Sequence, residues 1–133
     1  MSHTAKVSIR PLAVTLGLLA TGATVHAHHS FAAVYDQTQP VRVEGTVVQI
    51  DWRNPHVLFY VAPLGRDTAS TWTFEMGAPM VLTRRLGWSA DTIRVGDHIV
   101  VDGFMARKGD RQAAAQFVTT AAGKRLSAVL PFR

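Results

Sequence analysis

Three histidines have the clearest potential for chemistry in this sequence: His28, His29 and His56. The first two are adjacent, and the third follows an Asn-Pro pair. Neutral imidazole nitrogens are common ligands of copper, zinc and nickel, and imidazole loses its proton near neutral pH. The pattern therefore predicts a metal site, although adjacent histidines on an exposed segment can also be solvated without a ligand.

The segment before these histidines has the three parts of a secretory signal peptide. It begins with the basic residues Lys6 and Arg10, continues through an uncharged apolar run, and ends with Val25 and Ala27 as the small residues of a cleavage site. The apolar run is shorter than the ~20 residues of a membrane helix. We therefore expect residues 1–27 to be cleaved from a periplasmic or extracellular protein without a membrane span. An uncleaved anchor is the alternative.

The chemistry at the new N-terminus depends on the cleavage site. Cleavage after Ala27 would place an amine and an imidazole on His28, and the two nitrogens can chelate a metal ion. A third nitrogen from another histidine would complete the planar arrangement called a histidine brace, which suits Cu²⁺. His29, in second place, offers a different chelate through amine, amide and ring. Cleavage after Ala23 would instead put His26 in third place, which is another copper- or nickel-binding terminus.

His56 is the best candidate for the third ligand. The Asn-Pro pair before it makes a rigid turn, and a predicted strand begins with it. His98 begins another predicted strand and is a weaker candidate. Met76 and Met80 carry thioethers that could bind Cu⁺. Met76 continues the apolar face of a strand, however, so we expect it to pack in the core.

The composition narrows the classes of function. The chain has no cysteine, which excludes disulfides, thiolate metal sites and cysteine catalysis. Lys6 and Arg10 are two of its 14 basic residues, so the other 12 face nine acidic residues and leave a mature charge of about +3. That charge is too small to indicate nucleic-acid binding. The sequence has no phosphate-binding loop, zinc-protease motif or spaced carboxylate pair. These features favour a binding protein over an enzyme.

Alternating apolar residues predict five strands, with one short helix between the third and the fourth. We expect strands at 41–52, 56–62, 71–76, 98–106 and 112–120, a helix at 79–86, and a less regular tail from residue 121. The apolar phase of the first strand shifts after Gly45, which predicts a bulge there. This order is typical of an all-β, five-stranded OB-fold-like barrel, here at residues 41–133. A small open antiparallel sheet with one helix is the alternative.

A leader at residues 28–40 precedes the predicted barrel. Its apolar side chains, Phe31, Val34 and Tyr35, could pin it against the domain. Residues 36–40 have the composition of a turn.

Four stretches carry a resemblance: His28-His29-Ser30-Phe31, Gly45-Thr46-Val47, Trp52-Arg53-Asn54-Pro55-His56 and residues 96–103. Together they resemble a family of small exported bacterial proteins of unknown function, whose mature chains begin His-His-Ser-Phe and carry an Asn-Pro-His turn. The resemblance implies a periplasmic location and puts His28, His29 and His56 at motif positions. It implies no activity. Arg53 departs from the small polar residue expected at its position.

The sequence therefore predicts a periplasmic OB-type binding protein that holds copper for handling or delivery. His28 would supply amine and ring, with His56 and His29 adding nitrogens. A metal ion or a periplasmic protein is the expected partner, and nucleic acid is not. Two alternatives stay open: a metal-free module that binds a protein or small ligand on the barrel face, and a copper oxidase or oxygenase, which is less favoured because no substrate surface is evident.

Overall fold

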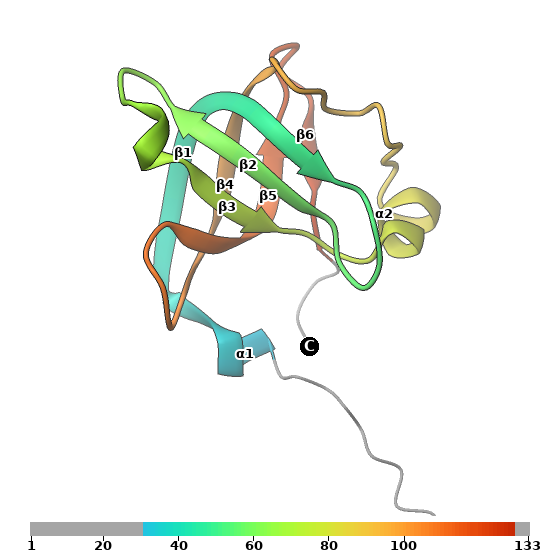
Figure 1. The fold of residues 1–133 in the computed structure, drawn as a ribbon. Helices are drawn as coiled ribbons and strands as arrows, with labels where there is room; N and C mark the ends of the chain where they lie inside the picture. Colours follow the sequence, from blue (N-terminus) through green and yellow to red (C-terminus); the bar gives the residue numbers. More distant parts are fainter. Residues whose placement is uncertain (1–30, 130–133) are drawn as a thin grey trace, which may run out of the picture.

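A computed structural model describes residues 31–129 of the 133-residue chain. The predicted signal peptide at residues 1–27, His28 and His29 lie outside the described residues. The elements in chain order are α1 (Phe31–Val34), β1 (Tyr35–Asp51), β2 (Leu58–Pro63), the 3₁₀ turn η1 (Thr68–Ser70), β3 (Trp72–Glu75), α2 (Pro79–Arg85), β4 (His98–Ala106), β5 (Gln112–Thr119) and β6 (Arg125–Ser127) (Figure 1). The described part of the chain is thus mostly β, as the sequence predicts. It contains no helix that is both long and apolar enough to cross a lipid bilayer.

The strands form one sheet that closes on itself. Its order is β3-β2-β1-β4-β5-β6, and β3 pairs again with β5, so that five strands make a ring and β6 pairs with the second half of β5. The β3–β5 pairing is parallel and all the others are antiparallel. The long strand β1 pairs with two strands, with β4 through its first part and with β2 through its second part. The ring differs from the open sheet that the sequence left as the alternative.

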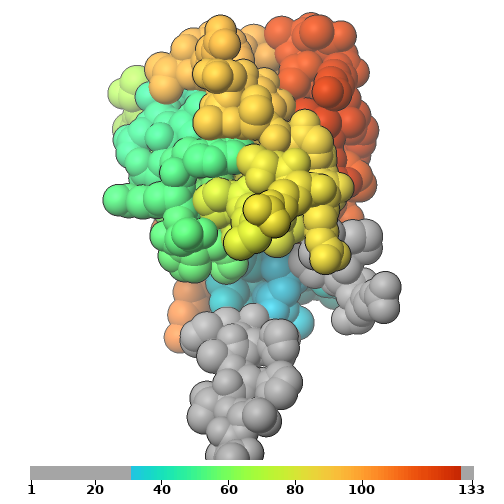
Figure 2. Space-filling model, turned by 90° about the vertical axis from the view of Figure 1, so that its right-hand side faces the viewer, coloured from blue at the N-terminus to red at the C-terminus, as the bar shows by residue number. Residues whose placement is uncertain are grey.

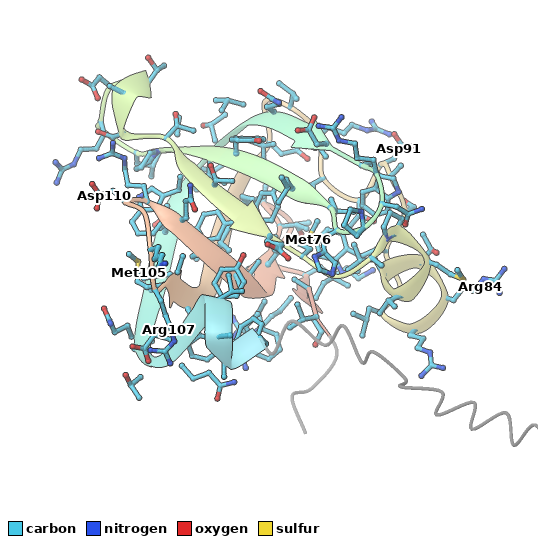
Figure 3. The ribbon with its side chains drawn as sticks, turned by 60° about the horizontal axis from the view of Figure 1, so that its bottom comes forward. Met76, Arg84, Asp91, Met105, Arg107 and Asp110 are labelled. Carbon is cyan, nitrogen blue, oxygen red and sulfur yellow. The ribbon has the colours of Figure 1, made fainter. Side chains whose placement is uncertain are left out.

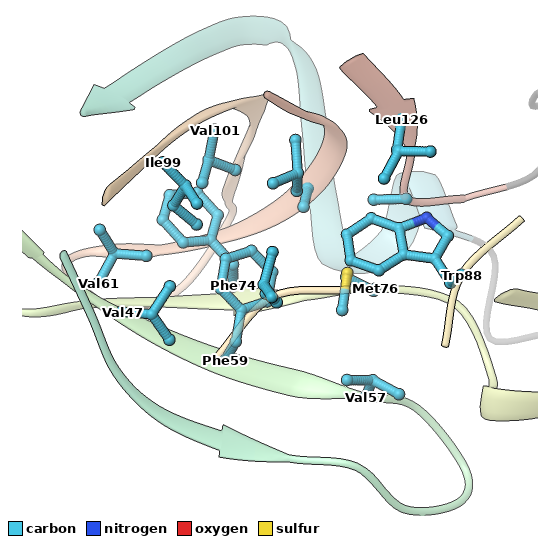
Figure 4. Close-up of a cluster of buried hydrophobic side chains, with 14 of the residues drawn as sticks. Val47, Val57, Phe59, Val61, Phe74, Met76, Trp88, Ile99, Val101 and Leu126 are labelled. Atoms are coloured by element: carbon cyan, nitrogen blue, oxygen red, sulfur yellow. The ribbon is translucent and has the colours of Figure 1, made fainter. Parts of the chain in front are cut away.

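The interior of the ring is filled by alternate apolar side chains from every strand (Figure 4). Phe59 and Phe74 stack at its centre with ring centroids 5.4 Å apart. Each fully buried side chain of this size contributes roughly 1.5–3 kcal/mol to folding. Met76 is buried against this cluster, as predicted, whereas Met80 on α2 is exposed. Trp88 closes the α2 end and donates its indole N–H to the Ser127 carbonyl.

The bulge in β1 lies three residues later than predicted. The register to β2 shifts between Val47 and Gln49, which leaves Val48 as the extra, exposed residue. Gly45 has a different role, since a Cβ there would lie 2.2 Å from the Ala62 carbonyl oxygen. The predicted shift of apolar phase is therefore correct, but the glycine serves the close approach of β2 and does not form the bulge.

Both ends of the sheet extend beyond the predicted strands. The turn predicted at residues 36–40 is wrong, because β1 begins at Tyr35 and already pairs there with Ala106 of β4. The register of this pair is irregular between Tyr35 and Pro40. The predicted irregular tail contains β6, which pairs with β5 from Phe117 to Thr119. The first strand therefore includes residues 35–40 of the predicted leader.

Candidate functional site

His56 lies on the β1–β2 connection, directly after a cis Asn54-Pro55 peptide bond. Its Nδ1 is 2.5 Å from Oε1 of Glu75, the last residue of β3, and its side chain is 52% exposed. This close contact holds the ring at Nδ1, so Nε2 is the ring nitrogen that could meet a ligand. Among residues 31–129, Nε2 has no hydrogen-bond partner. The structure thus fixes the ring through one nitrogen and leaves the other free.

Glu75 also binds the start of β1. Its Oε2 accepts a hydrogen bond of 2.5 Å from the Tyr35 hydroxyl, and Tyr35 is buried. Burial raises the pKa of Tyr35 far above its ordinary value, and the hydrogen bond to Glu75 and the negative charge of that carboxylate raise it further. The phenol therefore stays protonated and remains a donor. One carboxylate joins the tyrosine of β1 to the histidine of the β1–β2 connection.

Helix α1 is fixed to the same region by Arg107, which follows β4. The Arg107 Nε donates to the Ala32 carbonyl at 2.7 Å, and its backbone N–H donates to the Val34 carbonyl at 2.8 Å. Its Nη1 is 3.3 Å from Oδ2 of Asp36. Figure 3 shows Arg107 beside α1. Hydrogen bonds from Thr38 are the main reason that the pKa of Asp36 falls to about 2, and Arg107 lowers it further.

Aromatic packing completes the attachment of α1. The Phe31 ring lies 4.9 Å from the Tyr35 ring and meets Phe104 of β4 edge-on at 6.5 Å. The prediction that Phe31 and Tyr35 pin this segment is confirmed, whereas Val34 is exposed. In Figure 2, α1 (cyan), the β1–β2 connection (green) and α2 (yellow) lie next to one another on one face of the molecule. The start of the described chain therefore lies on the side of the domain that carries His56.

A model of a known protein family matches most of the chain. Residues 15–115 match a family of unknown function, DUF6152. The chain belongs to the DUF6152 family. The match includes the three predicted ligand positions as well as Tyr35 and Glu75, and it confirms the resemblance to an uncharacterised family. No curated protein matches the chain.

The other predicted ligands of this DUF6152 chain lie elsewhere or outside the described residues. The His98 Nε2 is 3.3 Å from Oε1 of Glu44 on β1, and its strand pairs with β1 at Thr46. No hydrogen bond or ion pair in the described part of the chain joins His98 to His56. Residues 31–129 hold no group of three or more His, Asp or Glu side chains that could bind a metal. His28 and His29 precede Phe31 and lie outside the described residues.

Sequence patterns alone did not indicate that Tyr35 and Glu75 belong to this site. In the pattern of β3, Glu75 is one polar residue on the outward face of an alternating strand. Only the pairing of β2 with β3, which sets Leu58 opposite Glu75, brings the carboxylate beside His56. Tyr35 reaches Glu75 because β1 begins before residue 41. Both contacts depend on strand register, which spacing along the chain does not reveal.

Proposed function

We propose that this DUF6152 protein is a periplasmic copper-binding protein, which handles or delivers the ion. Cu²⁺ would bind between the processed N-terminus and His56. One observation carries the proposal: the Glu75 carboxylate lies 2.5 Å from Nδ1 of His56 and leaves Nε2 for a metal. Histidines that bind metals almost always donate their other ring N–H to a carboxylate, carbonyl or water, which fixes the ring and raises its basicity. Beside His56, the Glu75 carboxylate lies where such a partner would be needed.

The attachment of α1 supports the participation of the N-terminal histidines. Phe31 packs on Tyr35, which donates to the same carboxylate that holds His56. Three residues of chain span at most about 10 Å, so His28 is within short reach of Phe31. After cleavage behind Ala27, the amine and ring of His28 together with the His56 ring would supply three nitrogens. Such a set favours Cu²⁺ over the other divalent metals of its row, and His29 could add a fourth nitrogen.

The export signal and the fold class belong to the same proposal. The pattern of residues 1–27 supports a cleaved signal peptide and thus a periplasmic location. The strand order supports an OB-type barrel, because β1 is shared by β2 and β4, β3 meets β5, and α2 lies between β3 and β4. Barrels of this type carry many unrelated functions, so the metal proposal depends on the residues around His56 and not on the fold.

Two measurements test the proposal. The intact mass of the protein recovered from the periplasm, with and without added copper, should give a chain that begins at His28 and gains the mass of one copper ion. Titration of this processed protein should give submicromolar Cu²⁺ binding that is lost in His28→Ala and His56→Ala. His98→Ala is the matched control and should bind like the parent protein. Absence of submicromolar binding, or equal binding in all three variants, would contradict the proposal.

A further inference from the structure

A second site lies at the other end of β3 from Glu75. A pocket of about 400 Å³ opens between β1, the connection from β2 to β3, and the starts of β3 and β5. Its lining includes Arg42, Glu44, Arg66, Ser70, Trp72 and Arg111. Three residues of strand separate Trp72 from Glu75, which is about 10 Å. The pocket and the His56 region are therefore distinct places on the molecule.

The pocket has an excess of positive charge. Three of the lining residues are arginines, and Glu44 is the acidic one. Within residues 31–129, the guanidinium groups of Arg66 and Arg111 have no hydrogen-bond or ion-pair partner. Arg42 is paired with Asp102 at 2.6 Å. Unpaired guanidinium groups offer several donors in a planar fork, which matches the oxygens of a carboxylate or a phosphate.

Two carboxylates, one that lines the pocket and one next to Arg66 in the chain, already have partners. Glu44 faces His98 at 3.3 Å, on the outside of the ring. Asp67, next to Arg66 in the chain, accepts a hydrogen bond of 3.0 Å from the Ser70 hydroxyl. The guanidinium donors of Arg66 and Arg111 therefore have no acceptor in the described part of the chain. Free donors of this kind are suited to bind an anion.

Backbone structure fixes one arginine at the pocket. Arg111 has a φ of 52°, a left-handed conformation that is uncommon for residues other than glycine, asparagine and aspartate. Its carbonyl accepts a hydrogen bond of 2.9 Å from the backbone N–H of Thr73 on β3. A non-glycine residue held in such a conformation is a reason to look for a function. Here the conformation sets the arginine beside Trp72, at the parallel pairing of β3 and β5.

Trp72 gives the pocket a flat apolar wall. The ring is half-buried and stacks on Phe74 with centroids 5.9 Å apart and an interplanar angle of 18°. Because Phe74 is itself fully buried in the core, the position of the indole is well fixed. A fixed indole beside two free guanidinium groups provides both a stacking surface and donors within one small space.

We propose that this pocket binds a small organic anion, in which a phosphate or carboxylate group is joined to a flat apolar body. Arg66 and Arg111 would bind the charged oxygens, and the body would lie against Trp72. The volume of the pocket falls within the range of sites for small molecules. The charged arginines lie on the loop side of the pocket and the aromatic wall lies on β3. This separation favours a ligand with both an anionic group and an apolar body over inorganic phosphate.

Phenyl phosphate is a suitable probe, with inorganic phosphate for comparison. Each would be titrated into the protein as recovered from cells and freed of metal, and backbone amide shifts would be followed by NMR. Phenyl phosphate should shift the amides around Arg66, Trp72 and Arg111, and should bind roughly 10-fold more tightly than phosphate, because stacking adds to the charged contacts. If the largest shifts lie outside the pocket, or if the two probes bind equally, the proposal is wrong.

Variants separate the two parts of the pocket. Arg66→Gln combined with Arg111→Gln should weaken phenyl phosphate binding roughly 10- to 100-fold, since hydrogen bonds to a charged group are lost. Arg84→Gln with Arg85→Gln makes the same charge change on α2, away from the pocket, and should leave phenyl phosphate binding unchanged. Figure 3 shows Arg84 on the opposite side of the molecule from Asp110, which precedes Arg111 in the chain.

Trp72→Leu should remove the preference for phenyl phosphate over phosphate. Should this variant fail to fold, the arginine pairs still decide the matter. Equal weakening by both arginine pairs would overturn the proposal, because binding would then follow net charge alone.

Discussion

The hydrogen bond between Tyr35 and Glu75 joins the first residue of β1 to the last residue of β3, and its contribution can be measured. Two substitutions remove it from either side. Tyr35→Phe deletes the donor and keeps the buried ring, whereas Glu75→Ala deletes the acceptor and also the contact with His56. A double-mutant cycle with both changes isolates the interaction between the two side chains.

The expected energies follow from burial. A hydrogen bond to a charged group contributes about 1.5–3 kcal/mol, and Tyr35 is buried. The contact with His56 is half-exposed and contributes roughly 0–1 kcal/mol. We therefore expect Tyr35→Phe to cost about 1.5–2 kcal/mol and Glu75→Ala about 2–3 kcal/mol. The double variant should cost little more than Glu75→Ala alone, which gives a coupling energy of about 1.5 kcal/mol.

Urea unfolding followed by tryptophan fluorescence would measure these energies. Trp88 and the partly buried Trp52 and Trp72 all pack against the core and report its loss. The slope of the transition should stay constant across the four proteins, so that shifts in midpoint reflect stability. A coupling energy below about 0.5 kcal/mol would refute the reasoning, because it would mean that the hydroxyl and the carboxylate contribute independently.

Three further perturbations test other parts of the structure. Gly45→Ala puts a Cβ 2.2 Å from a β2 carbonyl oxygen and should cost about 2–3 kcal/mol in thermal unfolding; Gly77→Ala, whose nearest contact would be 3.5 Å, should stay within about 0.5 kcal/mol. Because folding raises the pKa of Tyr35, its contribution to stability is complete below its ordinary value of 10.0 and falls as the pH rises beyond it. The decline in unfolding free energy above this pH should therefore be less steep in Tyr35→Phe. Arg107→Gln removes two hydrogen bonds to the start of the chain, so amide exchange at residues 32–36 should quicken about 5- to 10-fold while exchange in the ring stays unchanged.

Local patterns predicted those elements whose side chains alternate strictly or end in recognised signals. The predicted strand at 71–76 is observed as β3, and the predicted helix at 79–86 as α2, with Pro79 at its start and Gly87 after it in a left-handed conformation. β6 was missed because it has only three residues, of which Leu126 alone is buried. Its strand conformation depends on the free edge of β5 and not on its own sequence.

The candidate site shows the same division between local and long-range information. His56 was predicted from its neighbours, since the Asn-Pro pair and the following apolar residues mark a turn before a strand. Its partners were not, because Glu75 comes from another strand and Tyr35 from the start of the chain. Residues 35–40 are mostly polar, without alternation, and composition therefore predicted a turn. Pairing with β4 and burial of the Tyr35 ring make them a strand instead.

The parallel pairing of β3 with β5 has a consequence for the energetics of any ligand at His56. Only three residue pairs, from Thr73 to Glu75, close the ring at this seam. Tyr35 lies where β1 pairs with β4, and Glu75 lies on β3. A transient separation of β3 from β5 would therefore also separate Tyr35 from the carboxylate that positions His56. A ligand shared by the N-terminal segment and His56 would bind only the closed ring, and at 100 times its Kd it would stabilise that state by about 2.7 kcal/mol. Slowed hydrogen exchange at the amides of β3 would then report that the ligand is bound.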